Sequence, residues 1–155
     1  MSEILLPIGW IRDGEILTSY LYIPIILKEI PCCRGVGMDV RTAILDYQLS
    51  EKLKSELIIS SNLVSELTIM TEEDVAGAAK MVSLFLEAVS AEARIAYKIS
   101  MSKDFLESDG IIAKAISAVK IQDYEYVNNC IAEAISFVTN TAGKALQTLI
   151  ENRLI

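Results

Sequence analysis

The sequence predicts a mainly helical protein (α+β class), a helical bundle arranged around one long central helix and preceded by an N-terminal β-hairpin. Apolar residues recur at steps of three and four between residues 71 and 101, which is the spacing of a helix face. Residues 3–30 instead flank Asp13-Gly14, a dipeptide typical of a two-residue hairpin turn. We therefore expect a β-hairpin appendage over 1–31 and a helical bundle over 32–155, together forming one compact domain.

The expected hairpin carries an apolar and aromatic outer face. The turn at Asp13-Gly14 sets the register of the two strands, and alternation then places four large side chains on this face: Leu5, Ile11, Tyr20 and Tyr22. Tyrosine suits a protein interface because it combines a large apolar area with a polar tip. The face is therefore a candidate interface, and the alternative is that it docks onto the helices of its own chain.

A glycine-containing connector follows the hairpin and precedes a helix that Asp39 is expected to cap. Gly35 and Gly37 lie between Arg34 and Arg41, and glycine amides near a helix N-terminus can bind an anion. These four residues form a candidate ligand-binding site for a phosphate or nucleotide. The spacing matches neither a dinucleotide-binding motif nor a P-loop, so a flexible connector is the alternative.

The segment before the central helix has two interpretations. Residues 40–55 are predicted to be helical, with apolar side chains on one face. Between residues 57 and 70 the apolar residues alternate as in a strand, and Ser61-Asn62 offers a turn, which predicts a second short hairpin. A helical continuation that breaks at residues 60–62 explains the same short apolar runs.

The central helix is predicted from Thr71 to Met101. Thr71 is expected at the N-cap, and Glu72 and Glu73 place negative charge where a helix N-terminus favours it. A first apolar row contains Val75, Ala78, Val82, Phe85, Val89, Ala93 and Ala96, and a second row beside it contains Met81, Leu84, Ala88, Ala91 and Ile95. Two apolar rows predict a helix covered on most sides, with one polar strip in water.

The remaining third of the chain is predicted to contain shorter helical pieces. A helical turn is expected over 102–107, a break at 108–110 and a short helix over 111–119. Asp123 is expected to cap a last helix that runs to about residue 152. Its weak point is 139–143, where β-branched and polar residues and a glycine predict a bend or a division.

Composition limits the function more sharply than any motif does. The chain has 155 residues, a net charge of −7 and no histidine, so the commonest general base and metal ligand is absent. The acidic balance disfavours direct nucleic-acid binding. A membrane span needs roughly 20 consecutive apolar residues, and no uncharged run approaches that length. We therefore expect no membrane span. Cys32 and Cys33 are adjacent and Cys130 is distant, which gives no zinc or disulfide spacing and fits a reducing cytoplasm.

The first hypothesis is a non-catalytic assembly or structural subunit that acts through protein–protein contacts, either with itself as a homo-oligomer or within a larger protein complex. Hydrophobic residues make up 52% of the chain and the mean hydropathy is +0.40, which predicts apolar surface buried against another chain. No residue has a partner at catalytic spacing, so we expect neither an enzyme nor a cofactor or metal site.

Two other functions remain open at this stage. One is a small anion- or nucleotide-binding protein that uses the loop Arg34-Gly35-Val36-Gly37. The other is a helical subunit of a nucleoprotein complex, because in size and helicity the chain resembles the small subunits of archaeal CRISPR interference complexes. That resemblance implies an architectural role beside other subunits.

Overall fold

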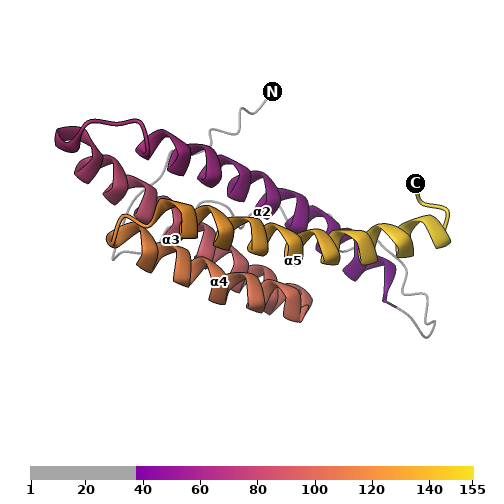
Figure 1. Ribbon diagram of the computed structural model, residues 1–155. Helices are drawn as coiled ribbons and strands as arrows, with labels where there is room; N and C mark the ends of the chain where they lie inside the picture. The colour runs from indigo at the N-terminus through magenta and orange to yellow at the C-terminus, as the bar shows by residue number, and fades with distance from the viewer. Residues whose placement is uncertain (1–37) are drawn as a thin grey trace, which may run out of the picture. The chain divides into compact units, whose positions relative to one another are not determined.

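The computed structural model describes residues 38–155, and this part of the chain consists of helices joined by short turns (Figure 1). Its helices are α2 (Val40–Leu67), α3 (Glu72–Ser100), α4 (Lys103–Lys120) and α5 (Tyr124–Glu151). No strand occurs among these residues. The hairpin predicted over 1–31 lies outside the described residues, so it stays a prediction.

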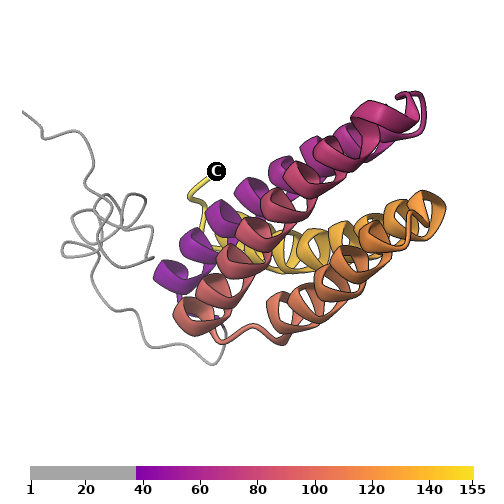
Figure 2. The ribbon, with the colours of Figure 1, turned by 90° about the vertical axis from the view of Figure 1, so that its left-hand side faces the viewer.

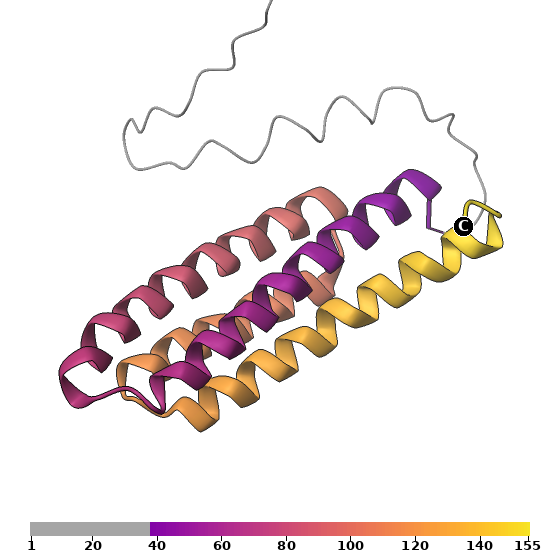
Figure 3. The ribbon, with the colours of Figure 1, turned by 90° about the horizontal axis from the view of Figure 1, so that it is seen from above.

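The four described helices form an up-down-up-down bundle. Each helix packs against the next one along the chain, and α5 returns to pack against α2, which closes the ring. Figure 3 shows successive helices running in opposite directions, and Figure 2 shows α2 beside α3 and α4 beside α5. Short connections favour such antiparallel neighbours. Among the described helices, each one therefore packs closely along its length against its two ring neighbours.

The core fills the space between these helices. Its largest fully buried side chains come from all four helices and include Leu53, Leu57, Leu86, Phe105, Ile112 and Ile131. Alanines at several contacts, such as Ala93, Ala115 and Ala134, are completely buried and let the helix backbones approach closely. Cys130 is also buried in this cluster, as the apolar pattern of the last helix predicts.

Every contact in the ring also has a polar link between helices. The links are Lys52 Nζ to Glu92 Oε2 (2.9 Å) for α2–α3, Arg94 Nη1 to Asp109 Oδ1 (3.4 Å) for α3–α4, Ser108 Oγ to the Ala134 carbonyl (3.0 Å) for α4–α5 and Ser61 Oγ to Asn128 Oδ1 (3.0 Å) for α2–α5. These links fix the rotation of each helix about its own axis.

The prediction of a long helix over 71–101 is confirmed, but this helix is not the centre of the bundle. Thr71 occupies the N-cap of α3, and Met101 ends the helix in a left-handed conformation. Nevertheless α3 makes the least extensive contacts of the four described helices, and α5 makes the most extensive. The described part of the chain is therefore organised around the α2–α5 pair.

The second hairpin predicted near 57–70 is wrong, and so is the alternative break at 60–62. Residues 57–67 are the last turns of α2, where Leu57, Ser60, Val64 and Leu67 face the core at steps of three and four. Ser60 donates to the carbonyl of Glu56 at 2.9 Å, so its hydroxyl bonds within the helix. The apparent alternation was accidental because burial follows the helical period.

Two predicted interruptions in the last third of the chain are also wrong. Residues 108–110 lie inside α4 and residues 139–143 lie inside α5, and both helices are continuous there. The polar residues that suggested breaks, Ser108 and Thr141, make hydrogen bonds to a neighbouring helix instead. The predicted cap at the start of the last helix is confirmed, because Asp123 accepts a hydrogen bond from the Tyr126 amide at 3.1 Å.

Candidate interaction surface

The two apolar rows of α3 lie on different sides of the helix. Most of the first row faces the bundle, and its members Val82, Val89, Ala93 and Ala96 are buried. The N-terminal half of the second row points away from the core. Met81 is 68% exposed and Leu84 is 51% exposed, so the expectation of a helix covered on most sides is wrong for the described chain.

We call the uncovered residues the α3 outer strip: Gly77, Met81, Leu84 and Ala88, all of them exposed. They succeed one another at steps of four, three and four, which keeps them on one side of the helix. The strip is uncovered because α3 touches only α2 and α4 among the described helices. A helix with ring neighbours on two sides has an outer side that only another molecule or another segment can cover.

An apolar groove borders the strip on the side of α2. It has a volume of about 470 Å³ and lies between the last turns of α2 and the first half of α3. Its lining is apolar except for one carboxylate: Leu63, Glu66, Leu67, Met70, Ala78, Met81, Val82 and Phe85. Leu63 and Met70 on its rim are 38% and 42% exposed, so the apolar surface extends from α3 onto α2 and the turn between them.

A second groove, of about 450 Å³, borders the strip on the side of α4. Its floor is apolar, but charged side chains line it from both helices, Lys80 and Glu87 from α3 and Lys120 from α4. Within residues 38–155, neither Lys80 nor Glu87 makes an ion pair or a side-chain hydrogen bond. Both charges are therefore available to a molecule that covers Leu84, which lies between them and lines the same groove.

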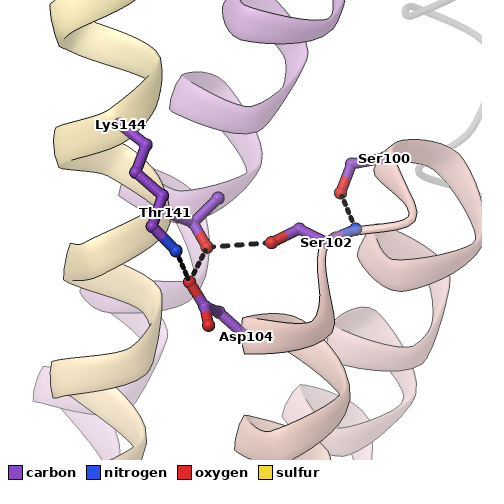
Figure 4. Close-up of polar contacts among 5 residues, drawn as sticks. All are labelled: Ser100, Ser102, Asp104, Thr141 and Lys144. Carbon is purple, nitrogen blue, oxygen red and sulfur yellow. Dashed lines mark hydrogen bonds and ion pairs between the residues drawn. The ribbon is translucent and has the colours of Figure 1, made fainter. Parts of the chain in front are cut away.

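A polar cluster lies where the α3–α4 turn and the start of α4 meet α5 (Figure 4). Asp104 Oδ2 accepts hydrogen bonds from Thr141 Oγ1 at 3.1 Å and from Lys144 Nζ at 2.8 Å. The hydroxyls of Thr141 and Ser102 are 3.2 Å apart, and the Ser102 amide donates to Ser100 Oγ at 3.0 Å. The cluster fixes the turn and the first turn of α4 against α5.

The chemistry of this cluster is structural. Its carboxylate is in the first turn of α4, where a negative charge is favourable, and it already accepts from a hydroxyl and an ammonium group. Asp104 already accepts hydrogen bonds from these two donors, so it is not placed as a general base for Ser102. The Ser100 side chain instead forms a hydrogen bond with the carboxyl group of Asp46.

A buried carboxyl group, that of Asp46 on α2, is a second polar feature. Its side chain is 1% exposed, and Oδ1 has no hydrogen-bond partner among the described residues. Burial raises the pKa of Asp46 above its usual range because the charged form loses its water, while a hydrogen bond with the Ser100 side chain acts in the opposite direction. One turn later, the Ser50 hydroxyl is also buried without a partner in the described chain.

The residues predicted as a ligand site are only partly described. Arg34, Gly35 and Gly37 lie outside the described residues, and Arg41 is exposed in the first turn of α2. The interface residues predicted on the hairpin, Leu5, Ile11, Tyr20 and Tyr22, are likewise outside them. Asp104 and Asp109 bond to different partners, and residues 38–155 contain no group of three or more acidic or thiol side chains that could hold a metal ion.

Sequence reasoning found the outer strip but assigned it the wrong environment. It identified Met81, Leu84 and Ala88 as an apolar row and assumed that neighbouring helices would cover it. The two sets differ in their direction around the helix axis, which can be calculated at about 100° per residue. Residues 82, 86, 89 and 93 point to one side of the helix, and residues 77, 81, 84 and 88 point to the other. The grooves beside the strip depend on helix packing and carried no sequence signal.

Comparison with known proteins gives no match to a protein-family model, a curated protein or a solved structure. Among the described helices, none is both long and apolar enough to cross a membrane. The function must therefore be argued from the geometry of the chain itself.

Proposed function

We propose that this chain is a non-catalytic assembly or structural subunit that acts through protein–protein contacts and associates with itself. The observation that supports the proposal most directly is the uncovered apolar surface formed by the α3 outer strip and the groove between α2 and α3. Monomeric proteins rarely leave contiguous apolar surface of this kind in water, and large exposed patches mark interaction sites.

The size of the hydrophobic effect supports association through this surface. Complete burial of a leucine or methionine side chain contributes about 1.5–3 kcal/mol. Leu63, Met70, Met81 and Leu84 are each between 38% and 68% exposed, so covering all four adds several such partial contributions. Together they are large enough to offset part of the entropy lost when two chains associate.

Polar groups on the described helices support a structural role more than a catalytic one. The interhelical hydrogen bonds of Asp104, Asp109 and Ser108 occupy the groups that could otherwise react. The most deeply buried carboxyl group, that of Asp46, lies under the surface and not in either groove. Among residues 38–155 the Ser100 side chain and the Asp46 carboxyl group are joined by a hydrogen bond, but neither residue lines either described groove.

The native mass of the full chain tests the proposal. Light scattering coupled to size-exclusion chromatography should give a mass above that of one chain, and the mass should rise with concentration across the micromolar range. The same measurement on an extract of the native host would show assembly with other proteins. A chain that migrates as a monomer both when purified and in that extract would contradict an assembly role.

The predicted hairpin face is a second surface through which the same function could act. Replacing Tyr20 and Tyr22 with serine should reduce the apparent mass if that face contributes, because two large amphipathic side chains are lost. Far-UV circular dichroism should stay unchanged, since the described helices do not include these residues. An unchanged mass would remove the hairpin face from the proposal and leave the α3 surface.

A further inference from the structure

The α3 outer strip has the spacing of a coiled-coil seam. Gly77, Met81, Leu84 and Ala88 follow the alternating steps of four and three that define positions a and d of a heptad repeat, and Ala91 and Ile95 continue the pattern with partial exposure. Such a seam faces a single partner helix, because a 3.5-residue repeat stays on one side of a slightly underwound helix. The expected partner is therefore another helix lying along α3.

A second copy of α3 in the antiparallel direction complements the strip. When Met81 lies opposite Leu84 of the second copy, two-fold symmetry repeats the contact, and Gly77 lies opposite Ala88 of the second copy. The largest and most exposed side chains then meet at the centre. The smallest residues meet on either side of them, where they let the two backbones approach closely.

Charges beside the seam select this register. Lys80 and Glu87 both occupy position g, and the antiparallel register places Lys80 of each copy opposite Glu87 of the other, which makes two ion pairs. Sliding the second helix by one heptad in one direction places Lys80 opposite Arg94 of the second copy. Sliding it by one heptad in the other direction places Lys80 opposite Lys80 of the second copy, so both shifts bring like charges together. A parallel pair sets Glu87 opposite Glu92. Of the registers compared, only the first puts opposite charges together.

Gly77 gives an independent reason to expect a close neighbour. It lies in the second turn of α3, where glycine is about 1 kcal/mol less favourable than alanine. A methyl group added there would meet nothing within 4 Å in the described chain, so its own fold does not require glycine. Gly110 and Gly143 are equally open but lie off the strip, and they provide matched controls.

We infer that α3 pairs antiparallel with α3 of a second copy, across a two-fold axis that crosses the outer strip between Met81 and Leu84. The inference rests on the proposed function and names its partner and surface. The grooves on either side extend the contact onto α2 through Leu63, onto the α2–α3 turn through Met70 and onto α4 through Lys120, because both grooves share residues with the seam. A stable interface buries about 800 Å² on each partner, more than one short helix pair provides alone.

Charge reversal tests the register directly. Lys80→Glu alone and Glu87→Lys alone should each raise the dimer dissociation constant about tenfold, because each places like charges opposite each other at two symmetric positions. The double variant Lys80→Glu with Glu87→Lys should return it to the native value. Sedimentation equilibrium of the full chain at low salt measures all four constants.

Leu84→Glu provides the strongest perturbation. It puts a carboxylate on either side of the two-fold axis in an apolar contact, and the dimer should be lost across the micromolar range. Leu84 is half-exposed in the single chain, so circular dichroism should be unchanged. The controls Lys114→Glu on α4 and Glu125→Lys on α5 reverse exposed charges away from the strip and should leave the mass unchanged.

The possible outcomes separate the inference from the proposed function. If the chain self-associates with an unchanged dissociation constant in Leu84→Glu and in both charge-reversal variants, the α3 pairing is overturned. The assembly role would then act through another surface. Weakened association without recovery in the double variant would overturn the antiparallel register. A monomer whose thermal stability falls with Leu84→Glu would show that another segment of the same chain covers the strip, and would overturn both the pairing and self-association.

Discussion

Helices α3 and α5 are almost equal in length, with 29 and 28 residues, but they differ in what they turn away from the core. Along the middle of α5, one run of outward positions carries Asn129, Glu133, Ser136 and Asn140. The equivalent spacing on α3 carries Gly77, Met81, Leu84 and Ala88. Both helices bury one apolar face in the same bundle, so the difference lies only in the opposite face. Exposed large apolar side chains of α5 lie near its ends, at Tyr126 and Ile150, whereas those of α3 include Met81 and Leu84 within the outer strip.

The grooves show the same asymmetry. Both described grooves border α3, one toward α2 and one toward α4, and their linings share the apolar outer residues Met81 and Leu84 with the strip. The contact of α5 with α2 is the most extensive in the described bundle, whereas that of α3 with α2 is the least extensive. The least extensive helix contact in the described bundle thus lies beside the apolar groove between α2 and α3.

The largest expected effect distinguishes the inner and outer faces of α3 itself. Leu86 is completely buried and Leu84 is half-exposed, although the two leucines are two residues apart. Leu86→Ala should lower the free energy of unfolding by about 2–5 kcal/mol, because it leaves a cavity in the core. Leu84→Ala should lower it by less than about 0.5 kcal/mol. Urea denaturation at low protein concentration measures both, and equal losses would mean that the chain covers its own outer strip.

A smaller effect concerns Asp46. This residue is polar but buried, whereas Leu84 is apolar but exposed. The pKa of Asp46 is raised by burial, so the folded chain holds this proton more tightly than the unfolded chain does. The associated stability is present below the unfolded pKa, near 3.8, and is lost as the pH rises through the folded pKa. Asp46→Asn should therefore raise the melting temperature at pH 7.

The advantage of Asp46→Asn over the native chain should shrink as the pH falls toward 4, because the native carboxyl group is then neutral too. Calorimetric melting of both chains at the two pH values checks the sign. The difference between the chains is the informative quantity, because the pKa of Glu56 is also raised by burial and contributes to both curves. A destabilised Asp46→Asn chain at pH 7 would mean that the hydrogen bond with Ser100 stabilises the charged carboxylate by more than burial costs it.

The smallest expected effect compares two glycines. Gly77→Ala and Gly110→Ala should each stabilise the single chain by about 0.5–1 kcal/mol, since alanine is the better helix former and neither position is crowded. Only Gly77→Ala should weaken self-association, because only Gly77 lies in the strip. Thermal melting and sedimentation of both variants separate the two effects. A loss of association in both would point to a general change in the bundle.

Some features of the fold could be predicted from local sequence, and others could not. The limits of α3 and the cap at Asp123 follow from residues within one or two turns, and both predictions are confirmed. The breaks expected at 60–62, 108–110 and 139–143 do not occur, because Ser60, Ser108 and Thr141 form hydrogen bonds inside the bundle. Whether a polar residue ends a helix or bonds to its neighbour depends on what packs beside it.

The same division applies to the candidate surface. The sequence by itself determined that residues 71–101 form a long helix and that this helix carries two apolar rows, because periodicity is a property of the chain alone. Only the tertiary structure decided which row is buried, since burial depends on which helices surround α3. Among residues 38–155 the closed ring places neighbours on two sides of every helix, and the residues that face away from the ring are left uncovered by the other described helices.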